Sequence, residues 1–178
     1  MKTLLISNSF WNFFNFRKNL VFELAKVNQI YLVANKDKFK KKFINTNIKT
    51  IKSSLNKNKI NILSDIRYLL FIFKIFKKIK PDIVVSFTFK PNLISLLVSR
   101  ILKIRSIITI SGLGTLFLNH KFLFYLILKI FKILINENVT IFFHNKDDYF
   151  IFKNKNIIKN AFKAQVINGS GVDFKKFK

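Results

Sequence analysis

The sequence predicts an α/β fold with a doubly wound, mostly parallel β-sheet. Short apolar runs rich in Ile and Val alternate with longer amphipathic segments along the 178 residues. Several of these runs lack the polar–apolar alternation of half-exposed strands, which is typical of parallel strands buried on both faces. A segment of helix length follows most runs, as right-handed βαβ crossovers require. The length suits one domain.

The apolar runs predict the strands in order. The expected strands are Thr3–Ser7, Ile30–Ala34, Lys49–Ile51, Ile83–Ser86, Ser106–Ile110, Val139–Phe142 and Gln165–Ile167. The first run is too short for the core of a signal peptide, so we interpret it as a buried strand. The polar stretch Lys52–Lys59 is expected to be a loop after the third strand.

The amphipathic segments between the strands predict helices. The expected helices are Asn12–Lys26, Lys36–Asn45, Ser64–Ile79, Pro91–Leu102, Lys121–Asn136, Lys146–Lys153 and Asn156–Phe162. Pro81 follows the third helix and ends it, because proline lacks the N–H that would continue the hydrogen-bond ladder. Pro91 fits the first turn of the fourth helix, where that N–H is not needed.

The net charge of +25 comes from 33 basic and 8 acidic residues. Such an excess points to a polyanionic partner, such as nucleic acid, anionic lipid or a phosphorylated substrate. The composition offers a second explanation, because 29 Lys against 4 Arg, with 27 Ile, 23 Phe and 20 Asn, is the drift expected of an AT-rich genome. The charge alone therefore selects no partner.

The residues present exclude several chemistries. The chain has no cysteine, which rules out disulfides, cysteine-ligated zinc and a cysteine nucleophile. Its two histidines are too few for a histidine-only metal site. The sequence contains neither a P-loop nor a GxSxG motif, and GLGTLF after the fifth strand lacks the third glycine of a dinucleotide fingerprint.

Two segments have the composition of membrane-interface helices. The first runs over residues 66–80 and the second over residues 122–135, which include Lys129 and Lys132. Both are too short or too charged for a spanning helix, which needs about 20 largely apolar residues. Each either packs an apolar face on the sheet or lies on an anionic membrane surface. The two interpretations are compatible if only one flank meets the membrane.

The loops after the strands are the expected site, because ligands bind beyond the carboxyl ends of a doubly wound sheet. The first such loop carries Trp11, Asn12, Asn15 and Arg17. Aromatic rings pack on sugar C–H surfaces, amides bind hydroxyl groups, and a guanidinium binds phosphate with paired hydrogen bonds. This loop therefore suits a sugar or a phosphorylated sugar, although its phenylalanines suit the core.

Later loops add further candidates. Lys90 stands at the start of the fourth helix, where it either binds an anion or is an ordinary surface lysine. His144 is either a base or a structural residue, and Asp147 and Asp148 either cap the next helix or take part in chemistry. All the glycines follow strands, where the backbone must bend or approach a ligand: Gly112, Gly114, Gly169 and Gly171.

Five sequence blocks together resemble a known family. They are NSFWNFFNFR, PDIVVSFTFKPN, TISGLGTLF, HNKDD and VINGSGVDFKKF. In this order they resemble the N-terminal half of a bacterial family-4 glycosyltransferase. The most similar branch adds an N-acetylhexosamine or related sugar to undecaprenyl-diphosphate-linked sugars in cell-surface glycan or glycoprotein assembly. Such enzymes have the GT-B fold, in which two Rossmann-like domains face a cleft.

The resemblance implies a domain organisation. Residues 1–167 would be the N-terminal, acceptor-binding domain, and residues 168–178 would begin the linker to a C-terminal donor domain that the sequence does not contain. The family retains the anomeric configuration and needs no metal or other cofactor, since the nucleotide-sugar is a co-substrate held by the donor domain. The isolated chain is then expected to be inactive, as a truncated product or as half of a split enzyme.

The resemblance also implies site residues, although it assigns no catalytic residue. The expected acceptor-binding residues are Trp11, Asn12, Asn15, Arg17, Thr88, Lys90, Asn92, Gly112, Leu113 and Gly114. The expected cleft or hinge residues are Asn145, Asn168, Gly169, Gly171 and Asp173. Many relatives carry a histidine after the fifth strand, whereas this chain has Ile110-Ser111-Gly112, as in the branch named above.

The expected partners follow from the same resemblance. They are a lipid-linked sugar acceptor, the inner leaflet of the plasma membrane on its cytoplasmic side, and a separate chain with the donor domain. The alternatives are a basic nucleic-acid-binding protein and a non-enzymatic scaffold at the membrane. No RRM, KH or helix-turn-helix signature is present, so a nucleic-acid partner is not expected.

Overall fold

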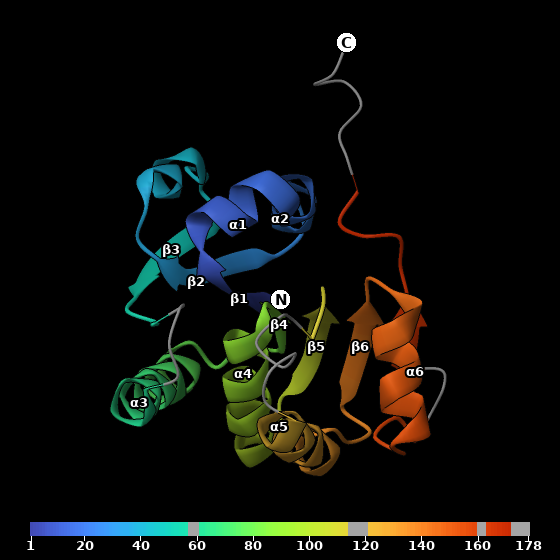
Figure 1. Ribbon diagram of the computed structural model, residues 1–178. Helices are drawn as coiled ribbons and strands as arrows, with labels where there is room; N and C mark the ends of the chain where they lie inside the picture. Colours follow the sequence, from blue (N-terminus) through green and yellow to red (C-terminus); the bar gives the residue numbers. More distant parts are fainter. Residues whose placement is uncertain (57–60, 114–120, 160–162, 172–178) are drawn as a thin grey trace.

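The computed structural model describes residues 1–56, 61–113, 121–159 and 163–171. Within these residues, seven parallel strands form one sheet in the order β3-β2-β1-β4-β5-β6-β7 (Figure 1). The strands are β1 (Lys2–Ser9), β2 (Gln29–Asn35), β3 (Ile48–Ser53), β4 (Ile83–Phe87), β5 (Arg105–Ile110), β6 (Val139–Phe143) and β7 (Ala164–Val166). The predicted doubly wound parallel sheet is confirmed, and β7 begins one residue earlier than expected.

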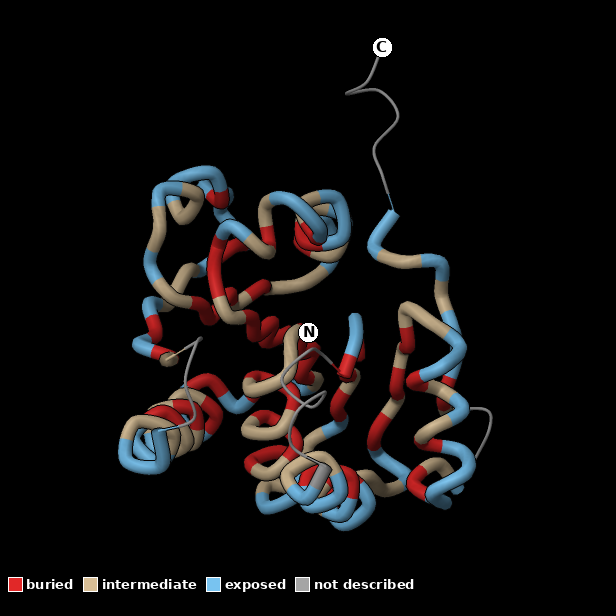
Figure 2. The backbone as a smooth tube through the Cα atoms, viewed as in Figure 1, coloured by how far each residue is buried: buried red, intermediate tan, exposed pale blue. Residues whose placement is uncertain are grey.

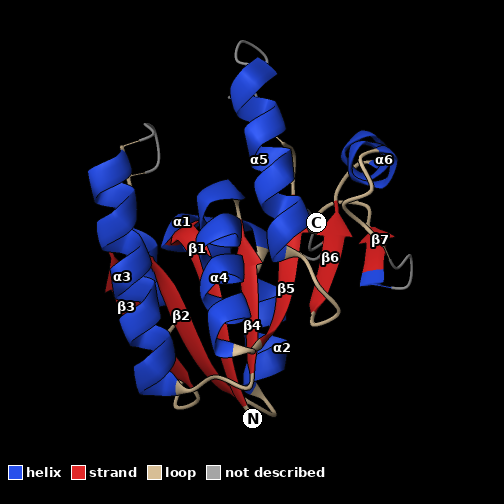
Figure 3. Ribbon diagram, turned by 90° about the horizontal axis from the view of Figure 1, so that it is seen from below, coloured by secondary structure: helices blue, strands red, loops and turns tan. Residues whose placement is uncertain are grey.

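Helices cover both faces of the sheet. They are α1 (Phe10–Phe16), α2 (Lys18–Ala25), the 3₁₀ helix η1 (Lys38–Lys42), α3 (Ile62–Ile79), α4 (Phe89–Leu102), α5 (Lys121–Leu134) and α6 (Lys146–Asn154). Figure 3 shows α3, α4 and α5 side by side on one face, with α1 and α2 on the other. This arrangement is the consequence of right-handed crossovers in both directions from β1.

The core lies between the sheet and these two helix layers, where Figure 2 shows most of the buried backbone. Leu4 and Ile6 of β1 pack against α3, while Leu5 between them packs against α1 and α2. A third cluster joins the far strands to α5 and α6 around Phe131, Phe143 and Phe152. The central strands β1, β2 and β4 are buried on both faces, which explains why the sequence shows no regular alternation along them.

Three predicted helices differ from the structure. The helix expected over Asn12–Lys26 is interrupted at Arg17, where φ and ψ are −135° and 6°. The helix expected over Lys36–Asn45 is only the 3₁₀ helix η1, in which several lysines repel one another. The helix expected over Asn156–Phe162 does not form at residues 156–159, because Asn156 takes a left-handed φ of 52°; residues 160–162 lie outside the described residues.

Among the described residues, no helix has both the length and the hydrophobicity to cross a membrane.

Candidate functional site

The candidate site lies at the carboxyl edge of the sheet. The order β2-β1-β4 places a topological switch point between β1 and β4, where the chain turns to opposite faces after each strand. Ligands of such sheets bind in the crevice beyond this point. The loops after β1, β4, β5 and β6 meet there, as the sequence predicted.

Arg17 is the central charged group of this edge. It ends α1, and its side chain is buried, with only 8% of the residue exposed. Its guanidinium carbon lies 4.8 Å from the centre of the Phe87 ring at the end of β4. One guanidinium nitrogen, Nη1, donates to the Phe16 carbonyl at 2.9 Å, and Nη2 lies 3.4 Å from Nε2 of His144. Arg17 thus joins the loops after β1, β4 and β6.

Among the described residues, no acidic side chain compensates the charge of Arg17. The ion pairs between described residues join Lys26 to Glu23 and Lys90 to Asp65, and neither involves Arg17. Burial lowers the pKa of Arg17 to about 10, so the group is protonated at neutral pH, but its burial costs free energy. A buried cation without a carboxylate is a suitable site for an anionic ligand.

His144 is the neutral partner of Arg17. A guanidinium has only donors, so Nε2 of His144 accepts and the ring proton is on Nδ1. Burial, and to a smaller extent the positive charge of Arg17, lower the pKa of His144 from its usual 6.5. The histidine is therefore neutral at pH 7 and holds the Arg17 side chain in place.

The lowered pKa of His144 predicts a pH dependence of stability. Because the unfolded chain binds this proton more readily than the folded chain, the free energy of unfolding should fall as the pH falls through 6.5. We expect His144→Gln, which keeps an acceptor for Arg17, to remove this part of the dependence. Urea denaturation of both proteins between pH 5 and pH 8 measures the difference, and His120 is present in both. Equal slopes would show that His144 does not titrate in this way.

Helix α1 presents exposed groups beside Arg17. Trp11 is 48% exposed, and its ring meets Phe16 edge to face at 5.4 Å. Asn15 is exposed and its amide donates to the Trp11 carbonyl at 2.9 Å. Asn12 is half-buried and accepts from the Ser7 hydroxyl at 3.0 Å. Of the predicted residues on α1, Trp11 and Asn15 are therefore available to a ligand.

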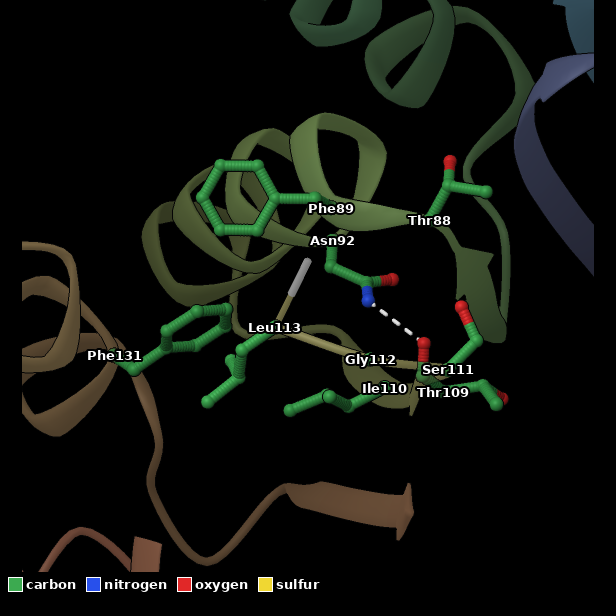
Figure 4. Close-up of a pocket in the computed structure, with 9 residues that line it drawn as sticks. All are labelled: Thr88, Phe89, Asn92, Thr109, Ile110, Ser111, Gly112, Leu113 and Phe131. Atoms are coloured by element: carbon green, nitrogen blue, oxygen red, sulfur yellow. Dashed lines mark hydrogen bonds between the residues drawn. The ribbon is translucent and has the colours of Figure 1, made fainter. Parts of the chain in front are cut away.

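Asn92 is buried in a polar network between α4 and the sheet. Its Oδ1 accepts from the Ser86 hydroxyl at 2.9 Å. Its Nδ2 donates to the Thr109 carbonyl at 2.9 Å, as Figure 4 shows. The residue is 2% exposed. The expectation that Asn92 contacts an acceptor does not fit this burial, because its amide already joins β4 to β5.

Thr88 links this network to the site edge. It has φ 72° and ψ 155°, a conformation that is essentially restricted to glycine. Its Oγ1 is buried and has no hydrogen-bond partner among the described residues. Backbone strain of this kind concentrates at functional sites. The cavity beside Thr88 has a volume of only about 10 Å³, so it holds at most one water molecule.

Lys90 is paired with an acidic residue. Its Nζ lies 2.8 Å and 3.0 Å from the two carboxylate oxygens of Asp65 on α3. The pair is mostly buried and ties α4 to α3. The anion site expected at Lys90 therefore already has a carboxylate of the protein itself.

The loop after β5 is held by α6. Asn145 caps this helix by accepting from the Asp148 N–H at 2.8 Å, and Asp148 accepts from the Asn145 amide at 2.8 Å. Asp148 also accepts from the Leu113 N–H at 3.2 Å. Leu113 packs into the core, whereas Gly112 is exposed with φ 149°. Asn145 and Leu113 are thus structural, and Gly114 lies outside the described residues.

The expected hinge residues follow β7. Asn168 is exposed in a turn, and Gly169 and Gly171 have φ of 67° and 75°. Their conformations favour glycine. Asp173 lies outside the described residues.

The structure thus brings Arg17 and the α1 side chains together at one edge. Sequence reasoning did not connect His144 and Phe87 to Arg17, because neither spacing nor composition shows which loops meet. The acidic partner of Lys90 was also missed, since Asp65 lies 25 residues away on another helix.

Sequence comparison assigns a family. The sequence model described as glycosyl transferase 4-like matches residues 2–145. A search of curated proteins finds no match to the sequence.

Solved structures share the fold. UDP-N-acetylglucosamine 2-epimerase from Rickettsia bellii has a TM-score of 0.69 and 11% identity, over 96% of this chain and 45% of that chain. A glycosyltransferase from Rickettsia africae ESF-5 has a TM-score of 0.62 and 19% identity, over 99% and 45%. MurG from Acinetobacter baumannii has a TM-score of 0.58 and 12% identity, over 97% and 46%.

This chain therefore spans less than half the length of each of these structures. At such identities the similarity establishes the fold alone, a Rossmann-like α/β domain equivalent to one half of a GT-B fold. Transferases and epimerases share that fold, so the sequence match over residues 2–145 is decisive. The chain belongs to the glycosyl transferase 4-like family.

Proposed function

We propose that this domain binds the acceptor of a glycosyltransferase, and that the acceptor is a sugar linked to a lipid through a diphosphate. The observation that carries the proposal is Arg17, a buried guanidinium at the switch point with no carboxylate partner among the described residues. A diphosphate group would supply the missing negative charge and accept paired hydrogen bonds from the guanidinium.

The exposed groups of α1 support the sugar part of this ligand. Trp11 offers an aromatic face and Asn15 an amide about one turn apart on α1, the helix that ends at Arg17. Sugars are commonly bound between such groups. Gly112, at the end of β5, leaves room for a ligand because it has no side chain.

The remaining parts of the reaction are proposed from the family. A nucleotide-sugar bound by a second, donor domain would be the co-substrate, with retention of anomeric configuration and no cofactor. In a split enzyme, a separate chain would carry that domain. The acceptor lipid would place the protein at the cytoplasmic side of the inner membrane, in the assembly of a cell-surface polysaccharide or glycoprotein. We do not propose a nucleic-acid partner.

A binding experiment tests this function. We expect the protein to bind a short-chain prenyl-diphosphate-N-acetylglucosamine in detergent at least about tenfold more tightly than the same sugar on a prenyl alcohol, because only the first carries an anion for Arg17. Isothermal titration calorimetry measures both affinities.

A third ligand separates the two functions that share this fold. UDP-N-acetylglucosamine carries the same sugar and a diphosphate but no prenyl chain, and it should bind more weakly than the prenyl-diphosphate sugar. Tighter binding of UDP-N-acetylglucosamine would contradict the acceptor role. It would favour a nucleotide-sugar site in this half of the fold.

A further inference from the structure

The outer face of α3 changes character along its length. Its exposed side chains in the first half are apolar, each between 48% and 75% exposed, apart from Arg67: Ile62, Leu63, Ile66 and Leu70. Its exposed side chains in the second half are all basic: Lys74, Lys77 and Lys78. The opposite face of the helix, with Tyr68, Ile72 and Phe76, packs into the core. The apolar side chains of the first half are therefore not required for packing.

Helix α5 repeats the same gradient. Phe122 is 82% exposed, and Tyr125 and Leu126 are about half exposed. Lys129 and Lys132 follow on the exposed face, where Ile133 is the one apolar exception among the described residues. The inward face, with Ile127, Leu128 and Phe131, packs into the core.

The two gradients point in the same direction. Both helices run antiparallel to the strands, so their N-terminal halves lie toward the carboxyl edge of the sheet. Figure 3 shows α3 and α5 on either side of α4, with their N-terminal ends extending past the tips of the strands. The exposed apolar side chains of both helices therefore lie at the end of the molecule that carries Arg17, and the lysines lie behind them.

On both helices, the distance between the exposed apolar side chains and the lysines matches the dimensions of a membrane interface. At a rise of about 1.5 Å per residue, Lys74 follows Ile66 by roughly 12 Å and Lys132 follows Leu126 by roughly 9 Å. An interfacial segment buries its apolar side chains roughly 5–10 Å into the headgroup and acyl boundary. When these tips enter the bilayer, the lysines reach the level of the lipid phosphates. The net charge of +25 favours an anionic surface in the same way.

We propose that the N-terminal halves of α3 and α5 dock on the surface of an anionic lipid bilayer, with the carboxyl edge of the sheet turned toward the membrane. Phe122, Ile66 and Leu70 would enter the interface, and the lysines behind them would bind lipid phosphates. The proposal deepens the proposed function, on which it rests for its purpose: a ligand carried by a lipid would reach Arg17 along this edge.

Vesicle flotation tests the docking surface without any acceptor lipid. The probes are phosphatidylcholine vesicles with and without phosphatidylglycerol. We expect binding to the anionic vesicles, and a loss of at least about tenfold in the double variants Ile66→Ser/Leu70→Ser and Phe122→Ser/Leu126→Ser. The matched control is Val27→Ser/Ile44→Ser, whose side chains are 79% and 84% exposed beside α2 and η1; this control should bind as the unchanged protein does.

A second set of variants tests the basic part of the surface. The triple variant Lys74→Gln/Lys77→Gln/Lys78→Gln should weaken binding to anionic vesicles about a hundredfold. Each lysine near such a surface strengthens binding roughly fivefold, and the variant removes three of them. The control Arg100→Gln/Lys103→Gln/Arg105→Gln removes the same charge from exposed residues at the opposite edge of the sheet, where α4 ends and β5 begins. Equal losses in the two triple variants would show that total charge, and not this surface, governs binding.

Two further outcomes would overturn the proposal. One is binding that the α3 and α5 variants leave unchanged. The other is that the protein does not bind vesicles but associates with itself, and that the α3 and α5 variants abolish this self-association. The surface would then be a contact between protein molecules. Circular dichroism melts show that each variant is folded. Because the vesicles contain no diphosphate-linked sugar, failure here leaves the calorimetric test of the acceptor site unaffected, and the reverse also holds.

Discussion

Replacing Arg17 with methionine should stabilise the free protein and remove its affinity for a diphosphate-bearing ligand. Burial lowers the pKa of Arg17 to about 10, because the charged guanidinium is poorly solvated in the folded state and has no carboxylate partner among the described residues. Methionine retains a flexible apolar stem without the charge. Part of the gain is offset by the lost contacts with Phe16 and Phe87, so we expect the melting temperature to rise by about 2–8 °C.

Whereas the stability of Arg17→Met should rise, its affinity for the prenyl-diphosphate sugar should fall. Loss of a buried, charge-assisted contact to phosphate should weaken binding of the prenyl-diphosphate sugar at least about thirtyfold. Arg105→Met is the matched control, because Arg105 is exposed at the start of β5, on the opposite edge of the sheet. Thermal denaturation and calorimetry on both variants measure the two effects. A destabilised Arg17→Met protein that still binds the ligand would show that Arg17 is structural.

Replacing Asn92 with alanine should destabilise the protein by about 3 kcal/mol, which corresponds to a fall of about 6–12 °C in melting temperature for a chain of this size. The substitution leaves the Thr109 carbonyl and the Ser86 hydroxyl without their partner in a buried region. Ser95 donates to the Ser86 hydroxyl at 2.8 Å and is affected with it. Thermal melts measure the loss.

Asn15→Ala is the control for this substitution. It removes the same amide from an exposed position with a single hydrogen bond, so it should change the free energy of unfolding by less than about 0.5 kcal/mol. If Asn92→Ala proved as stable as Asn15→Ala and instead lost ligand affinity, the buried network would not have the role that its hydrogen bonds indicate.

The strands were predictable because buried strands require runs of apolar residues, and such runs are visible in the sequence. Runs such as residues 83–86 must be apolar when helices cover both faces, and no other element of a soluble α/β domain requires this pattern so strictly. Helix boundaries were less predictable. The helix is interrupted at Arg17 because of the contacts that its side chain makes in the folded protein. The left-handed conformation of Asn156 is not indicated by the composition of the sequence around it.

The candidate site was predictable as a set of loops but not as a set of contacts. Arg17 was identified by its residue type and by its loop. Lys90 and Asn92 follow Thr88 closely in the sequence, so all three were expected to face a ligand. In the structure Lys90 is paired with Asp65, and Asn92 is buried and donates to the Thr109 carbonyl. Leu113 was placed among ligand-binding residues although its side chain packs into the core.

The sequence by itself determined the parallel α/β architecture and the resemblance to a glycosyltransferase family, and it indicated the edge of the sheet at which the candidate site lies. Each of these depends on local patterns of hydrophobicity and on motifs, which a linear chain records. The tertiary structure decided which charges are neutralised: within the described part of the chain, Arg17 contacts His144 and no carboxylate, whereas Lys90 pairs with Asp65. It also decided that the exposed apolar halves of α3 and α5 lie at one edge. The pairing of the charges and the position of the apolar side chains both depend on distances between segments that are remote in sequence. Only the packing of the sheet and its helices sets these distances.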